Sequence, residues 1–115
     1  MKIATVVFAM TAMAQPLACN LNALTPPERK EHTALSRRLI AAFGAPASTP
    51  DGWSFSLPIE MLNEVAKWID GERRCCPFLR FSLDVEPGAK TVGLTLSGRE
   101  GVKEFLAAEL KLRTF

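Results

Sequence analysis

The sequence lacks the residue patterns of the commonest enzyme sites. It has no tyrosine and one histidine, His32, and a single imidazole cannot build a conventional histidine-based catalytic metal site. It also has no Gly-rich phosphate loop, no Gly-x-Ser-x-Gly elbow and no His-Glu-x-x-His motif. These absences exclude most hydrolase and nucleotide-binding functions.

The chain also lacks an excess of one charge and a long apolar run. The 14 Lys and Arg residues against 12 Asp and Glu residues leave a net charge of +2 and form no basic stripe, so we expect no nucleic-acid partner. No apolar run is long enough for a transmembrane segment. A chain of 115 residues, 48% of them hydrophobic, can bury a core without a disulfide, so no metal is essential for folding.

Residues 1–18 admit two main interpretations, because a third, lipidation at Cys19, is disfavoured by the residue types at 16–18 before this cysteine. An apolar run between Lys2 and Ala14 that ends in small residues is typical of a secretory leader, although it is shorter than the usual length of about 15–30 residues. The β-branched and aromatic residues 6–8 favour instead an N-terminal strand. We expect a single domain over 19–115 in the cytoplasm, or in the periplasm or outside the cell if a leader is cleaved.

A first helix is predicted in the N-terminal half of the chain. Thr25 is a suitable N-cap, Pro26 suits the first turn, and Glu28 completes a capping box. Gly44 ends this helix. Residues 45–52 are predicted to be a loop, because they are rich in proline, serine, aspartate and glycine, the residue types that favour turns. The apolar stripe of the helix consists of Leu35, Leu39, Ala42 and Phe43.

Two further helices are predicted. One runs from Ile59 to Cys76, and Pro77 ends it because proline disfavours the helical conformation of the residue before it. The last begins at a second capping box, formed by Ser97 and Glu100. The apolar stripes are Met61, Leu62, Val65, Ala66, Trp68 and Ile69 in the first of these helices, and Val102, Phe105, Leu106 and Leu110 in the second.

Strands are predicted where apolar and polar residues alternate. Residues 53–57 form one such run, and residues 81–85 and 92–96 form a hairpin around the turn at 87–88. The order is then α-β-α-β-β-α. We therefore predict an α+β fold, a small two-layer sandwich with its helices on one face of a short sheet that contains antiparallel strands, in the order of an incomplete ferredoxin-like unit.

The residues best suited to chemistry lie at the end of the second helix. Cys75 and Cys76 follow Glu72 by three and four positions, so all three side chains can share one face of the helix. A partly desolvated carboxylate beside two thiols can accept protons, and the three groups together can also hold a soft metal ion. Glu72, Cys75 and Cys76 are therefore candidates both for catalysis and for metal binding.

Adjacent cysteines limit what this pair can do. A disulfide between neighbours joins α-carbons about 3.8 Å apart instead of the usual 5.5–6 Å, so such a bond is labile. Thiolates of Cys75 and Cys76 can instead bind one ion, and Cys19 as a third thiolate gives a trigonal site for As(III), Hg(II) or Cu(I). For Zn(II), His32 or a water molecule would add a fourth ligand. The pair resembles the cysteine pairs with which mercuric reductases take up Hg(II), an analogy of ligand chemistry that covers these two residues.

Each of these residues also has a structural interpretation. Cysteine is often buried as a small apolar side chain, His32 suits the border of a core, and Glu72 suits a surface ion pair. Trp53 and Trp68 are predicted to be core anchors. Three arginines close to the pair in sequence are expected to favour the thiolates against the helix dipole or to hold an oxyanion; they are Arg73, Arg74 and Arg80.

Three functions follow from these patterns. The first is a small protein that binds a soft metal or metalloid ion for sequestration or transfer through Cys19, Cys75 and Cys76, with Glu72 as proton acceptor. The second is a thiol redox enzyme that cycles a disulfide between Cys75 and Cys76 and acts on a thiol partner protein. The third is an interaction domain with buried cysteines that forms a homodimer through a sheet edge.

Overall fold

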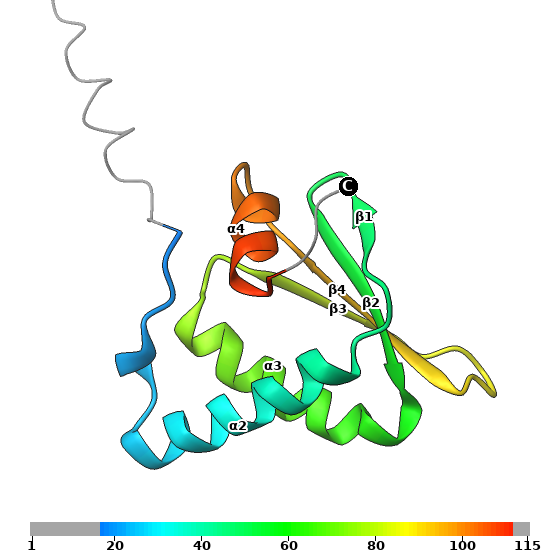
Figure 1. Cartoon of the computed structure of the whole chain (residues 1–115), viewed down its shortest axis with the longest axis horizontal. Helices are drawn as coiled ribbons and strands as arrows, with labels where there is room; N and C mark the ends of the chain where they lie inside the picture. The colour runs from blue at the N-terminus through cyan, green and yellow to red at the C-terminus, as the bar shows by residue number, and fades with distance from the viewer. Residues whose placement is uncertain (1–16, 112–115) are drawn as a thin grey trace, which may run out of the picture.

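The computed structural model describes residues 17–111, so the predicted leader or N-terminal strand falls almost entirely outside the described residues. Three α-helices and four strands make up this part of the chain (Figure 1). In chain order the elements are η1 (Leu21–Ala23), α2 (Pro26–Ala42), β1 (Ala47–Thr49), β2 (Gly52–Pro58), η2 (Ile59–Met61), α3 (Leu62–Cys75), β3 (Arg80–Asp84), β4 (Thr91–Ser97) and α4 (Val102–Glu109).

The strands form one antiparallel sheet in the order β1-β2-β4-β3. Because β4 lies between β2 and β3, those two strands are parallel to each other and are joined by α3. This split β-α-β arrangement is the core of a ferredoxin-like unit. The predicted α+β two-layer fold is confirmed, with one strand more than the predicted order contains.

The additional strand is β1, which occupies part of the segment predicted to be a loop, 45–52. It forms a hairpin with β2, in which Ser48 pairs with Trp53. None of its three residues is fully buried, so β1 has no apolar alternation that could have predicted it. Pairing with β2 defines β1 as a strand, and a sequence pattern carries no information about that pairing.

One face of the sheet carries the core. Alternate residues of β2 and β4 are buried there with side chains from α2, α3 and α4, which places all three helices on the same face. Trp53 and Trp68 are 7% and 1% exposed, which confirms both as core anchors. The sheet contributes Trp53, Phe55, Leu57, Val92, Leu94 and Leu96, and the helices contribute Leu35, Leu39, Val65, Trp68, Val102, Leu106 and Ala107.

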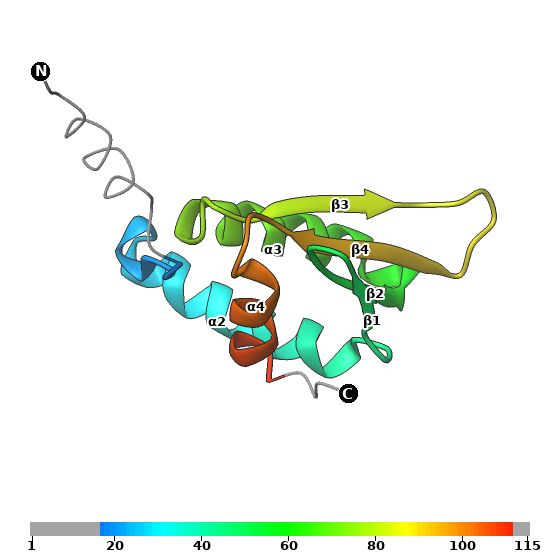
Figure 2. The ribbon, with the colours of Figure 1, turned by 90° about the horizontal axis from the view of Figure 1, so that it is seen from above.

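In the hairpin of β3 and β4, the apolar residues of the predicted strand 81–85 are less buried than those of β4. Leu83 and Val85 are 40% and 49% exposed, and only Phe81 among the three apolar residues is partly buried. Figure 2 shows the reason: the hairpin extends beyond the helices, so its outer half has no helix to pack against. Alternation predicted the strand correctly, but the buried face ends where the helical layer ends.

One of the two predicted capping boxes is present. At the start of α2, Thr25 accepts a hydrogen bond from the backbone of Glu28, and the Glu28 carboxylate accepts one from the backbone of Thr25. The box of Ser97 and Glu100 is wrong, because α4 begins after Gly101 and has no side-chain cap. Ser97 is instead the last residue of β4, where it pairs with both neighbouring strands.

Helices α2 and α3 run antiparallel and are linked by charged side chains along their contact. Near one end Arg38 pairs with Glu64, and near the other Arg74 pairs with Glu28. This pairing brings the N-terminal half of α2 beside the C-terminal end of α3, where the cysteines lie. Within residues 17–111, no helix combines the length and the hydropathy needed to cross a membrane.

Candidate functional site

The candidate site lies where three parts of the chain meet. These are the C-terminal end of α3, the N-terminal half of α2, and residues 17–24, which we call the strap. Figures 1 and 2 both place the strap beside the end of α3. Leu24 anchors the strap to α3, because it is 3% exposed and packs with Cys75 and Cys76 in a small cluster separate from the main core.

Cys19 of the strap and Cys76 are joined by a disulfide that spans 57 residues of sequence. The two sulfurs therefore converge, but as a covalent bond and not as two thiolates. In this state the predicted trigonal set of three thiolates does not exist, and the predicted bond between Cys75 and Cys76 is not the pairing that forms. Cys75 is a free thiol, 1% exposed.

The environment of Cys75 favours the protonated thiol. Burial, with a smaller contribution from the nearby Glu72 carboxylate, raises the pKa of Cys75, and the lowering effect of Arg74 does not outweigh them. The thiol donates a hydrogen bond to the carbonyl of Gly71, with the sulfur 3.2 Å from the oxygen. The expectation that the arginines activate this thiol is therefore wrong for Cys75.

Acidic residues pair with two of the three arginines. Arg74 binds both carboxylate oxygens of Glu28, at 3.1 Å each. This contact and the backbone of Thr25 lower the pKa of Glu28 to about 2. Arg73 pairs with Asp70 on its own helix, at 2.7 Å. An oxyanion would have to displace these carboxylates, which argues against the predicted anion site.

Glu72 and His32 form a pair that reaches across from α3 to α2. The imidazole Nε2 of His32 donates to Oε2 of Glu72 over 2.7 Å, and the side chains are 10% and 20% exposed. The ring of His32 also lies parallel to that of Trp68, with the centroids 6.4 Å apart. His32 is therefore both a satisfied border histidine and a member of the site.

Cys75 completes a group of three potential metal ligands with this pair. One ligand atom each from His32, Glu72 and Cys75 lies within 4.8 Å of the other two. Ligand atoms around a tetrahedral ion, each about 2.0–2.3 Å from it, are roughly 3.3–3.8 Å apart. Adjustments of about 1 Å would therefore bring the three atoms to coordination distance.

All three ligands border the same cavity. It has a volume of about 550 Å³ and lies between the strap, α2, α3 and α4. Cys19 and Trp68 also line it, together with Phe105 from α4. The cavity therefore has a largely apolar wall, to which Cys75, His32, Glu72 and Cys19 of the disulfide all belong.

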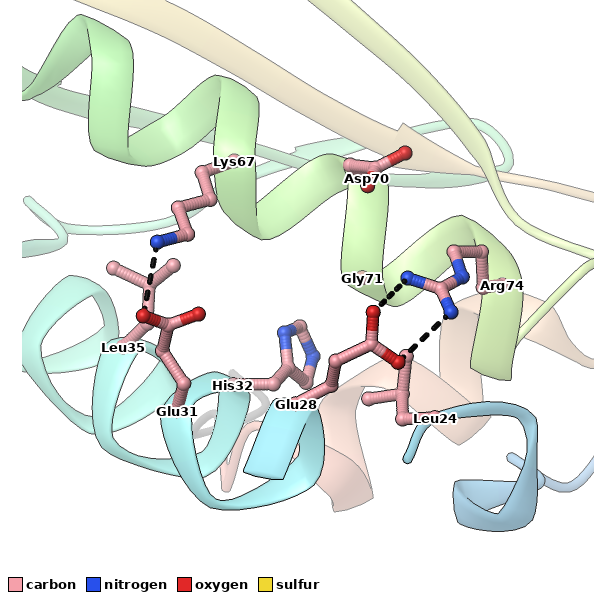
Figure 3. A pocket seen from close by; sticks show the side chains of 9 residues that line it. All are labelled: Leu24, Glu28, Glu31, His32, Leu35, Lys67, Asp70, Gly71 and Arg74. Carbon is pink, nitrogen blue, oxygen red and sulfur yellow. Dashed lines mark hydrogen bonds and ion pairs between the residues drawn. The ribbon is translucent and has the colours of Figure 1, made fainter. Parts of the chain in front are cut away.

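His32 also lines a smaller pocket between α2 and α3. Figure 3 shows His32 extending from α2 toward Gly71 of α3. A Cβ atom at residue 71 would lie 2.4 Å from Nδ1 of His32, too close for any real contact. Gly71 is therefore what lets the imidazole fit against α3, and it helps to place Nε2 beside Glu72.

The sequence predicted some of this site but not its ligand set. Their spacing on one helix grouped Glu72 with Cys75, whereas His32 was predicted only as a fourth ligand for Zn(II). The partnership of Cys19 with Cys76 and the role of Gly71 had no sequence signal beyond an odd number of cysteines and a glycine inside a helix.

Comparisons with protein families, with curated proteins and with solved structures found no match to this chain.

Proposed function

We propose that the protein binds a thiophilic metal ion in this cavity, for sequestration or transfer, with Cys75, Glu72 and His32 as its ligands while the disulfide is intact. The observation that carries the proposal is the approach of the three ligand atoms to within 4.8 Å of one another, from two different helices, at the wall of a cavity. A thiolate, an imidazole and a carboxylate together suit borderline ions such as Zn(II) or Cd(II).

The surroundings support a site that opens toward the cavity. Three protein ligands leave a fourth position free, and the cavity has room there for a water molecule or a ligand passed from a partner. The ion would replace the hydrogen bond between His32 and Glu72 and the proton of Cys75. Low exposure of all three side chains strengthens the attraction between the ion and the two anionic ligands.

The two other functions, a thiol redox enzyme and an interaction domain, stay predictions. A redox enzyme that cycles a bond between Cys75 and Cys76 requires a pairing that differs from the observed one. An interaction domain with buried cysteines fits Cys75 and Cys76, which are both almost fully buried, but gives no role to the cavity. Mapping the disulfide by mass spectrometry after native purification distinguishes these two alternatives.

Titration of the oxidised protein with Cd(II) tests the proposal, because a thiolate bound to Cd(II) produces an ultraviolet charge-transfer band. We expect one ion per chain and a band that Cys75→Ser abolishes. Removal of a ligand in Glu72→Gln or His32→Gln should cost more than the roughly 10–100-fold that loss of an outer-shell partner costs.

Glu64→Gln is the matched control for Glu72→Gln. Glu64 lies on the same helix and pairs with Arg38 at the exposed contact of α2 and α3, away from the cavity. Its substitution should leave Cd(II) affinity unchanged. Wild-type affinity in Cys75→Ser, or equal losses in Glu72→Gln and Glu64→Gln, would show that the ion does not bind at this site.

A further inference from the structure

The disulfide holds two more sulfur atoms, those of Cys19 and Cys76, close to the same site. Cys19 lines the cavity, and its partner Cys76 has its sulfur 3.9 Å from Oε1 of Glu72. We propose that reduction of the Cys19–Cys76 disulfide converts the site into one of three thiolates, from Cys19, Cys75 and Cys76, that takes soft ions of the As(III), Hg(II) or Cu(I) class. The inference rests on the proposed function, since Cys75 is a ligand in both states.

Contacts other than the disulfide hold Cys19 in place. The backbone N–H of Asn20, the next residue, donates to the carbonyl of Cys75 over 2.8 Å. The guanidinium of Arg74 reaches the carbonyl of Ala23 at 3.4 Å. Together with buried Leu24, these contacts tie the strap to the end of α3. Breaking the sulfur bond therefore leaves the thiol of Cys19 near the other two.

Glu72 lies beside both adjacent cysteines. One of its oxygens is 3.9 Å from the sulfur of Cys76, and its carboxylate belongs to the ligand group of Cys75. The carboxylate thus lies near both the sulfur that is free in the oxidised protein and a sulfur that becomes free on reduction. The two states of the site therefore share one location.

The reaction requires an external reductant, and a dithiol is one that acts by thiol–disulfide exchange. Cys76 is fully buried and Cys19 is only partly buried at the cavity wall, so the attacking thiolate reaches the sulfur of Cys19. The bond between Cys19 and Cys76 breaks, and Cys76 leaves as a thiolate that takes one of the two protons of the dithiol. The second sulfur of the dithiol then closes a disulfide with the first, which releases Cys19 with the other proton.

The change in ligands changes which ions bind well. A set of one thiolate, one imidazole and one carboxylate favours borderline ions, whereas three thiolates favour soft ions. As(III) makes the difference clear, because arsenite, As(OH)₃, reacts with three thiols to give three As–S bonds and three water molecules. The oxidised protein has one thiol at the site and cannot form such a complex.

The experiment compares arsenite and Cd(II) on both redox states, with a phosphine as reductant because added thiols would compete for the ions. The phosphine takes up the oxygen of one water molecule and becomes a phosphine oxide as the disulfide gains two electrons and two protons. We expect Cd(II) to bind in both states, with a charge-transfer band about threefold stronger after reduction because three thiolates replace one. Arsenite should bind only the reduced protein, one per chain.

Serine variants of the cysteines test the ligand set. Cys19→Ser and Cys76→Ser each leave two thiols, so arsenite affinity should fall at least about tenfold, as for loss of a metal-site partner. Ala18→Ser is the matched control, because it adds a hydroxyl at the cavity beside Cys19 and keeps all three thiols. It should bind arsenite like the wild type.

Protection of the thiols provides a second measurement that needs no variant. In the reduced wild-type protein, arsenite should block alkylation of all three cysteines, as counted by mass spectrometry. If Cd(II) binds the oxidised protein but arsenite protects fewer than three cysteines after reduction, the three-thiolate site is wrong and the proposed function stands. If Cd(II) does not bind the oxidised protein, the proposed function itself is wrong.

Discussion

Reduction of the Cys19–Cys76 disulfide should lower the stability of the fold by a large and calculable amount. The bond closes a loop with a sequence separation of 57 residues. In the chain-entropy treatment, opening a loop of this length gives the unfolded chain about 4 kcal/mol of additional conformational freedom at 25 °C. The folded state loses little in return, because Leu24 and the hydrogen bond from Asn20 still hold the strap.

Urea denaturation followed by tryptophan fluorescence measures this difference. Trp53 and Trp68 are both buried, so unfolding exposes two reporters from different parts of the core. We expect the free energy of unfolding to fall by about 4 kcal/mol when a phosphine reduces the protein, and by a similar amount in Cys19→Ser. Because small domains are stable by only about 5–15 kcal/mol, the reduced protein should remain folded at 25 °C with a clearly lower midpoint.

The control is Ala18→Ser, which lies next to the disulfide and leaves it intact; its midpoint should match that of the wild type. A loss below about 1 kcal/mol, in a sample whose disulfide has been verified by thiol counting, would refute the entropic argument. It would mean that the unfolded chain already keeps the strap close to α3, or that the bond strains the folded state.

Three further predictions concern packing and charge. Gly71→Ala should displace His32, lower stability by about 1–3 kcal/mol by overpacking and weaken Cd(II) binding, as calorimetry would measure; an unchanged affinity would contradict the role of Gly71. Glu28→Gln should be less stable than the wild type at pH 7, because folding lowers the pKa of Glu28 from 4.5 to about 2 and so favours the charged carboxylate. Protonation of the carboxylate removes this stabilisation, so urea titrations should show the difference in unfolding free energy shrinking as the pH falls from 4.5 toward 2. Leu94→Ala should cost about 2–5 kcal/mol at a fully buried position, whereas Leu83→Ala, at a position 40% exposed, should cost much less; equal midpoints for the two would contradict the assigned core.

The secondary structure was largely predictable because its signals are local. Capping by Thr25 and Glu28 fixed the start of α2, and apolar periodicity located α3, α4 and three of the four strands. The failures share one cause. β1, the exposed half of β3 and the uncapped start of α4 all depend on which neighbour a segment meets, and periodicity along the chain carries no information about that.

In the candidate site, too, the local contacts were predictable and the long-range contacts were not. Helix geometry alone places Glu72 beside Cys75 and Cys76, since residues three and four positions apart share a helix face. No local rule links His32 to Glu72 across 40 residues, or Cys19 to Cys76 across 57. The sequence therefore identified where the chemistry could lie but misjudged which sulfurs are free and which side chains accompany them.

The sequence by itself determined the α+β class, most of the elements, and a helix end that carries a carboxylate and two cysteines, because these follow from residue periodicity and spacing. Tertiary structure alone decided that α2 runs antiparallel to α3 with His32 opposite Glu72, and that the strap brings Cys19 to Cys76 and leaves Cys75 free. The physical reason is that these contacts depend on how the packed core orients whole elements, and that orientation results from the burial of side chains distributed over the entire chain.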